Sequence, residues 1–396
     1  MKKLTNILTI NGGSSSIKFA LYRMNEVLEK ILTGQIDRIG LPGMKLIFNY
    51  SVEDRKGSVD LATGDYKTAV GSLIDWLETQ DEFSSVVAIG HRIVHGMQHT
   101  EPEIVTQELL EELHRIKMYD PNHLPGEIEL IEAFRQQNPE LTQIVCFDTA
   151  FHGNMPRVAK LLSIPRRYEA KGMRRYGFHG LSYSYLMQEL EGIEGARVAN
   201  GRVILAHLGN GASMAAVKKG RSLDTTMAFT PAAGLMMSTR SGDIDPGLLS
   251  FLARTEQMTA LQFDHMVNHE SGLLGVSEIS SDMQDLLFQE EKDVRASEAV
   301  DLFCYQAKKQ IGAYAATLDG LDTLVFAGGI GENSPAIRYR ICEGLTFLGI
   351  ELNEEYNKQS KGLISTEASQ VAVRVIKTDE EYMIAKIVLK SLALEG

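Results

Sequence analysis

The sequence has few cysteines, no membrane-length apolar run and no excess of positive charge. Its three cysteines, Cys146, Cys304 and Cys342, lie far apart and no Cys-x-x-Cys occurs, which argues against a disulfide framework and a thiolate metal site. No apolar run approaches the roughly 18 residues of a membrane helix, and no apolar secretion signal follows the N-terminal lysines. The net charge of −12 argues against nonspecific binding to nucleic acid or anionic membranes. We therefore expect a cytoplasmic protein with neither kind of partner.

The sequence also lacks Gly-x4-Gly-Lys-Ser/Thr, which excludes a P-loop protein. Instead it has two similar segments half a chain apart, 7–21 and 204–217, each with an apolar run, a turn of Gly, Asn and Ser, and a second apolar run. Glycine lets the backbone come close to a ligand, and free N–H groups in such a turn can bind phosphate oxygens. Because 396 residues are too many for one core, the paired turns predict a duplicated domain that binds one polyphosphate.

The order of the expected elements also repeats along the chain. In the first half, apolar runs predict strands at 4–10, 17–22, 27–36, 44–50, 86–89 and 144–147, and helical spacing predicts helices at 65–78, 107–117 and 127–137. In the second half, strands are expected at 203–206, 214–217, 222–226, 323–326 and 371–376, and helices at 293–318 and 379–392. Three strands followed by alternating helices and strands, twice over, predict two α/β domains with mixed sheets and a cleft between them.

Polar residues within apolar segments are the candidates for chemistry; they lie in 91–95, 147–152, 174–180 and 238–243. Asp148 directly follows a strand, at the carboxyl end where open α/β sheets bind ligands. Taken singly, each arginine or histidine is about as well explained by an ion pair or a core position. Several cationic groups near one carboxylate and two phosphate-binding turns favour phosphoryl transfer.

A third glycine-rich segment, 324–334, lies between a strand and a helix that Pro335 could begin. This context suits a nucleotide at a helix N-terminus, although a structural turn would explain it about as well. His265 and His269 lie one helical turn apart without the glutamate of a zincin motif, so a solvated helix face explains them better.

As an ordered set, these segments resemble the acetate kinases, which belong to the acetate and sugar kinase/heat-shock 70/actin superfamily. The matching segments are Asn11–Lys18, His91–Gly96, Phe147–His152, Arg175–Gly180, His207–Ser213, Asp224–Pro231, Ser271–Ser277 and Gly328–Asn333. The resemblance implies an α/β fold of two duplicated actin-like (ribonuclease H-like) domains with mixed sheets and an active-site cleft between them. Residues 1–149 with 380–396 would form the acyl-substrate and phosphate domain, and 150–379 the nucleotide-binding domain. A homodimer is implied by the resemblance alone.

The resemblance also implies roles for individual residues. Asp148 matches the catalytic carboxylate, His179 and Arg240 match the transition-state stabilisers, and Arg92 matches the arginine that holds the substrate carboxylate. Val94, Phe178 and Pro231 match the apolar pocket for the acyl methyl group, and Asn11 and Glu380 the positions associated with Mg²⁺, for which Mn²⁺ could substitute. The residues implied to bind ATP or ADP are Ser14, Ser16, Lys18, His207, Leu208, Gly209, Asn210, Gly211, Asp282, Met283, Gln284, Gly329, Ile330, Gly331, Glu332 and Asn333.

Two positions depart from the family pattern. Where the family has Pro-Leu-His-Asn-Pro, this chain has Lys117-Met-Tyr-Asp-Pro121, which places Tyr119 at the substrate-site histidine and Met118 at an adjacent apolar pocket position. A phenol donates a hydrogen bond but carries no positive charge. His123 could supply that charge instead. Gln284 stands where the family usually has arginine, which affects the adenine or ribose contact.

Together these observations predict an acetate kinase that transfers a phosphoryl group from ATP to acetate, reversibly and with Mg²⁺. The nearest alternative is the same chemistry on propionate or butyrate. An alternative of another class is a nucleotide-switched binding protein like actin or the chaperones. Such a protein would need neither Arg92 nor the apolar Val94, Phe178 and Pro231.

Overall fold

The computed structural model describes residues 5–13, 15–51 and 55–395, which form two compact units. The first unit combines Met1–Ala150 with Asp379–Gly396, and the second is Phe151–Thr378. The expected division differs from this one at Ala150 and Asp379. Asp379 lies with the first unit because it accepts a hydrogen bond from the Tyr22 hydroxyl (3.4 Å) and pairs with Lys30.

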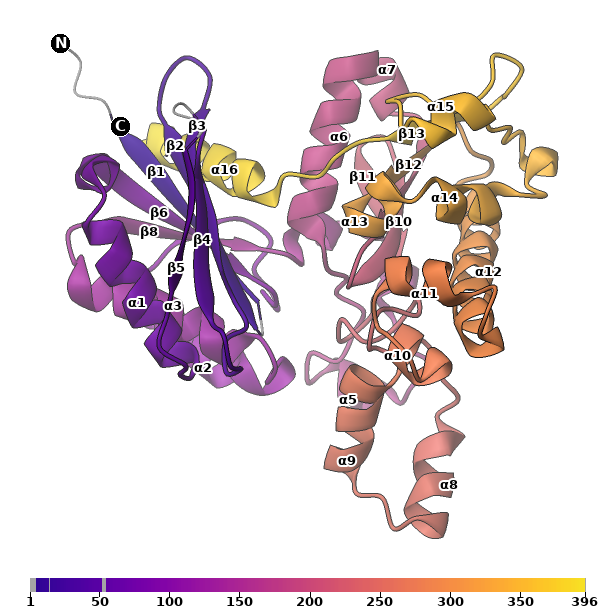
Figure 1. Cartoon of the computed structure of the whole chain (residues 1–396), viewed down its shortest axis with the longest axis horizontal. Helices are drawn as coiled ribbons and strands as arrows, with labels where there is room; N and C mark the ends of the chain where they lie inside the picture. Colours follow the sequence, from indigo (N-terminus) through magenta and orange to yellow (C-terminus); the bar gives the residue numbers. More distant parts are fainter. Residues whose placement is uncertain (1–4, 14, 52–54, 396) are drawn as a thin grey trace. The chain divides into compact units, whose positions relative to one another are not determined.

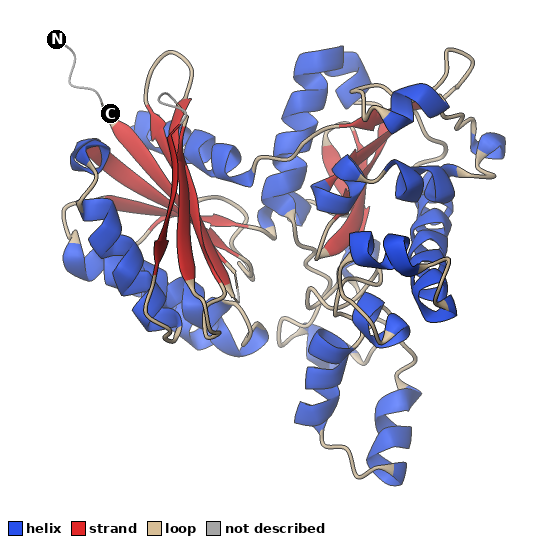
Figure 2. Ribbon diagram, viewed as in Figure 1, coloured by secondary structure: helices blue, strands red, loops and turns tan. Residues whose placement is uncertain are grey.

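The first unit contains an eight-stranded mixed sheet in the order β5-β4-β3-β2-β1-β6-β8-β7 (Figures 1 and 2). Its strands are β1 Asn6–Gly12, β2 Ser16–Arg23, β3 Glu29–Asp37, β4 Lys45–Tyr50, β5 Arg55–Asp60, β6 Val86–Ile93, β7 Glu103–Ile104 and β8 Thr142–Phe147. The strands from β1 to β5 pair antiparallel, whereas β6 pairs parallel with both β1 and β8. The carboxyl ends of β1, β6 and β8 therefore share one edge of the sheet.

Helices cover both faces of this sheet: α1 Tyr66–Glu78, α2 Gln107–Ile116, α3 Leu124–Gln137 and α16 Glu380–Glu395. The α1 and α3 helices bury the larger apolar core, in which Phe19, Leu73 and Phe134 are fully enclosed. The opposite face is covered by α16, the yellow helix of Figure 1. A Cβ at Gly90 would lie 2.5 Å from Ile384, so glycine there lets α16 pack directly on β6.

The second unit repeats the central strand order of the first. Its five-stranded sheet has the order β11-β10-β9-β12-β13, which corresponds to β3-β2-β1-β6-β8. Its strands are β9 Arg202–Leu208, β10 Ala212–Lys218, β11 Arg221–Thr225, β12 Thr323–Ala327 and β13 Ala372–Val375. The first three pair antiparallel, and β12 pairs parallel with β9 and β13. The expected duplicated α/β fold with mixed sheets is confirmed.

Helices of the second unit pack on both faces of its sheet. One face is covered by α6, whose Tyr183 and Leu186 are fully buried, and α12 contacts β9, β10 and β11. The helices are α4 Arg157–Lys160, α5 Arg166–Glu169, α6 Gly180–Glu194, α7 Ala196–Ala199, α8 Gly247–Thr255, α9 Ala260–His265, α10 Gly272–Ser277, α11 Met283–Gln289, α12 Val294–Thr317, α13 Gly328–Asn333, α14 Pro335–Cys342 and α15 Glu354–Lys358. No helix in the described part of the chain has the length and apolarity needed to cross a bilayer.

Most expected elements are present with bounds shifted by a few residues. The strand β5 was not expected, because its sequence Arg-Lys-Gly-Ser-Val-Asp is polar, as suits an edge strand that is largely exposed. The helix α3 begins at Leu124, with Pro125 in its first turn, and not at Glu127 as expected. The glycine-rich segment after β12, for which a structural turn was one of two explanations, forms the short helix α13.

Candidate active site

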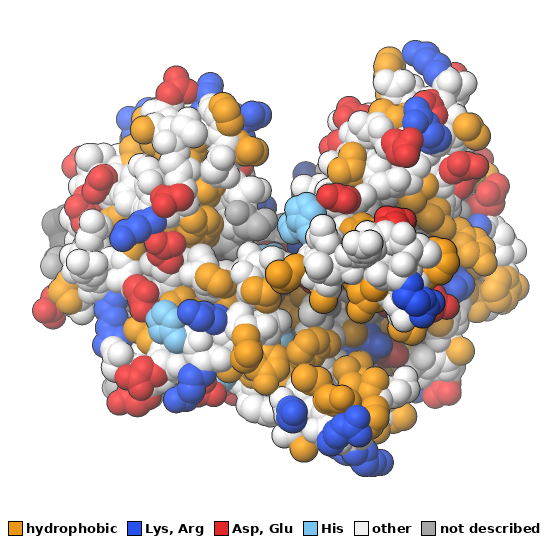
Figure 3. All heavy atoms as spheres, turned by 90° about the horizontal axis from the view of Figure 1, so that it is seen from below, with side chains coloured by type: hydrophobic (Ala, Val, Ile, Leu, Met, Phe, Trp, Pro, Cys, Tyr) orange, Lys and Arg blue, Asp and Glu red, His pale blue; other side chains and the backbone are white. Residues whose placement is uncertain are grey.

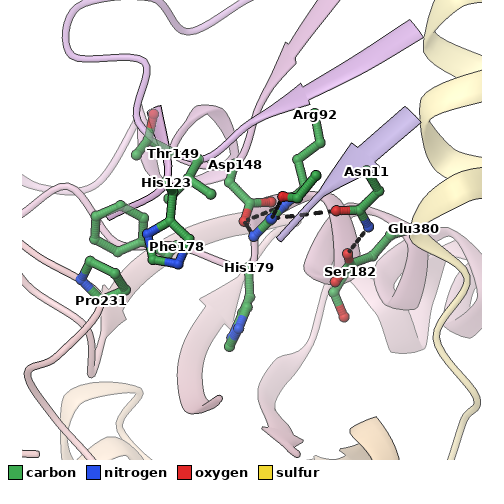
Figure 4. Close-up of polar contacts among 12 residues, drawn as sticks. Asn11, Arg92, His123, Asp148, Thr149, Phe178, His179, Ser182, Pro231 and Glu380 are labelled. Atoms are coloured by element: carbon green, nitrogen blue, oxygen red, sulfur yellow. Dashed lines mark hydrogen bonds and ion pairs between the residues drawn. The ribbon is translucent and has the colours of Figure 1, made fainter. Parts of the chain in front are cut away.

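An arginine–aspartate pair lies at the carboxyl edge of the first unit's sheet. Arg92 is near the end of β6, and Asp148 follows β8, where its N–H donates to the Ile93 carbonyl at 2.9 Å. Arg92 donates from Nε (3.2 Å) and Nη2 (2.7 Å) to one carboxylate oxygen of Asp148, which is completely buried (Figure 4). Burial would lower the pKa of Arg92, but Asp148, Glu380 and Glu127 outweigh it and raise that pKa, so Arg92 keeps its charge.

A cluster of oxygen-bearing side chains adjoins this pair. The Asn11 amide nitrogen donates to Glu380 at 3.1 Å, and its oxygen accepts from Arg92 Nη1 at 3.4 Å (Figure 4). The same nitrogen also donates to Glu381 at 3.2 Å. Burial and the neighbouring Glu380 raise the pKa of Glu381. No group of three or more His, Cys, Asp or Glu that could hold a metal is found in the described ranges. One amide and two carboxylates nevertheless match the hard oxygen donors that Mg²⁺ takes, with water completing its shell.

The first hairpin turn joins β1 to β2 as expected, with Gly13 N–H donating to the Ser16 carbonyl at 2.8 Å. Ser14 lies outside the described residues. Lys18 is exposed on β2, where it lines a cavity of about 320 Å³ together with Lys30, Gln35, Lys56 and Glu381. This cavity borders the Asn11 cluster through Glu381.

In the second unit, two histidines stack beside the second hairpin, which is formed by β9 and β10. His179, at the N-terminus of α6 with φ of 59°, donates to or accepts from the Ser213 hydroxyl at 2.9 Å through Nδ1. Its ring stacks on that of His207 at 4.3 Å. A Cβ at Gly211 would lie 3.3 Å from His179 Nε2 and 3.8 Å from Arg240 Nη1, so His179 and Arg240 both lie close to the same turn. Arg240 also donates to the Pro231 carbonyl at 3.3 Å.

The glycine-rich segment after β12 meets this second hairpin. A Cβ at Gly209 would lie 3.6 Å from the Gly329 nitrogen, and one at Gly328, where φ is +76°, would lie 2.7 Å from the Leu208 carbonyl. Only glycine permits that approach and that backbone angle at residue 328. The structure therefore brings two of the expected nucleotide-binding segments, 207–211 and 329–333, into direct contact. The helix α13 begins at this contact, so its first backbone N–H groups lie there.

Several side chains in these segments are engaged in the local structure. Glu332 accepts from the N–H groups of Gly328 (2.9 Å) and Thr378 (3.0 Å), and the Asn333 amide donates to the Gly329 carbonyl (2.9 Å). Asp282 caps α11 by accepting from the N–H of Gln284 at 2.7 Å, and Met283 is buried. The carboxylates of Glu332 and Asp282 are therefore occupied by backbone N–H groups of their own segments.

Comparison with known proteins supports the resemblance. A family model described as the acetokinase family matches residues 6–386. The chain belongs to the acetokinase family. It is 43% identical to an acetate kinase of Rhodopseudomonas palustris (strain TIE-1) over 388 residues, covering 96% of each chain. It is also similar to the crystal structure of Porphyromonas gingivalis acetate kinase (TM-score 0.88, 36% identity, 98% and 100% covered) and to that of a propionate kinase from Francisella tularensis (TM-score 0.90, 36% identity, 97% and 98% covered). The expected actin-like fold is confirmed.

The apolar positions of this acetokinase differ in exposure. Val94 and Phe178 are buried, and Pro231 is half-buried. Tyr119, in the 3₁₀ turn Lys117–Tyr119, is half-buried with its ring 6.3 Å from that of His95. Met118 is 77% exposed, and its expected place in an apolar pocket stays a prediction.

Two buried residues were not singled out by the sequence analysis. Arg338 in α14 donates to the carbonyls of Gly331 (2.8 Å) and Glu332 (3.0 Å) and so fixes the end of α13; burial lowers its pKa to about 10. Glu127 in α3 accepts from the Val94 N–H with both carboxylate oxygens, at 3.2 and 3.0 Å. A signal for Glu127 is visible in the sequence: it lies on the apolar face of α3, at helical spacing from Leu124 and Ile131.

Proposed function

We propose that this chain is an acetate kinase that transfers the γ-phosphoryl group of ATP to acetate, giving acetyl phosphate and ADP, reversibly and with Mg²⁺. Membership of the acetokinase family supports phosphoryl transfer to a carboxyl group with ATP as co-substrate. The observation that carries the proposal is Arg92, an arginine held by a buried carboxylate and adjoining the apolar Val94. A planar guanidinium suits a carboxylate, and the adjacent apolar side chain suits a short acyl group.

In this mechanism the main task of the protein is to neutralise negative charge, because no proton has to be removed from the substrate. Acetate is ionised at neutral pH, so its oxygen attacks the γ-phosphorus without a base. The bond from that phosphorus to the bridging oxygen breaks, and ADP leaves with the electron pair. The barrier is the approach of a carboxylate to a polyphosphate. Arg92 binds the carboxylate, and Arg240 and His179 donate to the oxygens of the transferring group, where charge is redistributed in the transition state.

Asp148 acts in this mechanism by positioning Arg92 and not as a general base. Its carboxylate is completely buried, and one of its oxygens accepts two hydrogen bonds from Arg92. Asn11 and Glu380, with Glu381, would hold Mg²⁺. When bound, Mg²⁺ supplies neutralisation of the phosphate charge.

The test of this function is a coupled assay of ADP formation with acetate, propionate and butyrate. An acetate kinase shows the highest kcat/KM with acetate. Propionate kinase activity is the second candidate, because the Francisella tularensis structure with a TM-score of 0.90 is described as a propionate kinase. One methylene in an apolar pocket is worth about 1–3 kcal/mol, so the preference should be about 10–200-fold. ATP hydrolysis that no carboxylate stimulates would instead indicate a nucleotide-switched protein.

Tyr119 offers a test of the departure from the family's histidine. A neutral hydroxyl donor contributes about one hydrogen bond, so Tyr119→Phe should lower kcat by roughly tenfold. Tyr119→His should remain active and gain a pH dependence near neutrality, because imidazole titrates there. The measurement is kcat against pH for all three proteins. If Tyr119→Phe matches the wild type at every pH, Tyr119 only packs, and His123, whose Nδ1 lies 2.8 Å from Asp120, becomes the residue to replace.

We also propose a homodimer, supported by apolar side chains on the second unit's surface. Phe251 on α8 is 54% exposed and Leu261 on α9 is 84% exposed. Figure 3, seen from below, shows hydrophobic side chains gathered over this end of the unit. Apolar surface of this kind commonly marks a protein interface. Sedimentation velocity at micromolar concentration should give a dimer mass, and a monomer at every concentration would contradict the proposal.

A further inference from the structure

We propose that Glu127 is a positioning residue for the carboxylate substrate. It holds in place the end of β6, which carries Arg92, and the following residue Val94. By gaining or losing a proton, Glu127 also changes how strongly Arg92 attracts that substrate. This inference rests on the proposed function, because it assigns the acyl carboxylate to Arg92. It concerns a side chain of α3 that is not among the residues expected to bind the nucleotide.

The hydrogen bonds of Glu127 place it directly behind the proposed acyl site. Both of its carboxylate oxygens accept from the Val94 N–H, at 3.2 and 3.0 Å. The preceding residue, Ile93, accepts from the Asp148 N–H at 2.9 Å. The chain that follows Arg92 is therefore held on one side by Asp148 and on the other by Glu127, so movement of Glu127 would shift both Val94 and Arg92.

Glu127 lies in an apolar setting with a strong local field. It is only 2% exposed, on the face of α3 that carries Leu124, Ile128 and Ile131. A buried carboxylate is costly to ionise unless it is well paired. Burial raises the pKa of Glu127 to about 8; Asp120 and Asp148 add to this rise, whereas Arg92 and the Val94 N–H oppose it.

The titratable groups around Glu127 come from several elements. They are Tyr66 of α1, Arg92 of β6, Asp148 after β8 and Asp120 before α3. The Tyr66 phenol, whose pKa burial raises further above its usual value, stays neutral throughout. A Cβ at Gly12 would lie 2.7 Å from the Tyr66 hydroxyl and 3.7 Å from Glu127 Cγ, so this pocket is closely filled. Water therefore has little room to screen a charge on Glu127.

The sign of the effect follows from these charges. Below about pH 8 Glu127 carries its proton, and Arg92 faces one nearby buried carboxylate, that of Asp148. Above about pH 8 Glu127 ionises and adds a further negative charge to those of Asp148 and Glu380 near Arg92. The attraction of Arg92 for an incoming carboxylate then falls, so the KM for acetate should rise while the KM for ATP stays constant.

The experiment measures the KM for acetate, the KM for ATP and kcat from pH 6.5 to 9.5 in the wild type, Glu127→Gln and Glu129→Gln. In the wild type, the KM for acetate should rise about tenfold across this range, which corresponds to one pKa unit of coupling. Glu127→Gln keeps an oxygen to accept from the Val94 N–H but cannot ionise. The KM of this variant for acetate should therefore change less than twofold across the same pH range. Glu129, half-buried two residues further along α3, is the matched control and should leave the wild-type profile intact.

A second measurement follows the proton itself and needs no substrate. Infrared difference spectroscopy between the wild type and Glu127→Gln should show a protonated carboxyl band that disappears as the pH is raised through about 8. The inference is overturned by a wild-type KM for acetate that does not change with pH, by a Glu127→Gln enzyme that keeps the rise, or by a band that is absent at neutral pH. A wild type whose ATP turnover does not depend on a carboxylate would instead refute the proposed function. The infrared titration would still report on Glu127 in that case.

Discussion

Replacing Arg240 with alanine should lower kcat by about 10²–10³, which is the range seen when a donor to a transition-state charge is removed. Arg240 lies close to the turn at Gly211, as His179 does, and is half-buried. ATP affinity should change much less, because a contact that strengthens only as the phosphoryl group transfers contributes to kcat and not to ground-state binding. The measurement is kcat and the KM for ATP at saturating acetate.

The matched control for Arg240→Ala is Arg197→Ala. Arg197 is an exposed arginine in α7 of the same unit, away from the surface proposed for the dimer on α8 and α9. Its loss should leave kcat within about twofold of the wild type, as is usual for surface substitutions. An Arg240→Ala enzyme that loses ATP affinity and kcat to the same extent would make Arg240 a uniform nucleotide binder and remove it from the transition state.

Replacing Arg92 with alanine should raise the KM for acetate by about a hundredfold and lower kcat as well. Losing one partner of a buried, hydrogen-bonded charge pair costs about 2–5 kcal/mol of binding, and 2.7 kcal/mol corresponds to about a hundredfold. The KM for ATP should be nearly unchanged. A folded Arg92→Ala protein with wild-type acetate kinetics would refute the assignment of the substrate carboxylate to Arg92.

Stability must be measured in the same experiment, because Arg92→Ala leaves the completely buried Asp148 without its partner arginine. Breaking such a pair costs about 3–5 kcal/mol of the free energy of unfolding. The double variant Arg92→Ala/Asp148→Asn removes both charges and should regain much of that stability without regaining acetate affinity. A double variant that recovers both would show that Arg92 acts through the fold alone.

The two glycine-containing hairpins show which features local sequence can predict. The pattern of apolar run, turn and apolar run predicts both hairpins because the residues that form each one are neighbours in the chain, and the β1–β2 and β9–β10 hairpins follow it. The order of strands after each hairpin likewise indicates the duplicated α/β fold. By contrast, the polar edge strand β5 is missed because its sequence lacks the apolar alternation of a half-buried strand.

The individual histidines required the tertiary structure. His152 is a core residue whose ring nitrogens form hydrogen bonds with the Ser222 hydroxyl at 2.8 Å and the Phe178 carbonyl at 3.0 Å. His179 instead stacks on His207 beside the turn at Gly211. His265 and His269 do lie on a largely exposed helical segment, with ring centroids 4.9 Å apart. Sequence spacing leaves the core and site explanations about equal for each residue, because the partners of a histidine lie far along the chain.

By itself, the sequence determined the duplicated α/β class, the two glycine-containing hairpins and the acetokinase resemblance, because each depends on residues that are close together or on the order of short motifs along the chain. Only the tertiary structure decided which distant groups meet. It joins Asn11 to Glu380 and Glu381, Arg92 to Asp148, and Glu127 to Val94. It also decided that Glu127 is buried, since the start of α3 at Leu124 turns that carboxylate into the core. Burial and the charges of sequence-distant neighbours set a pKa, and neither can be read from local sequence.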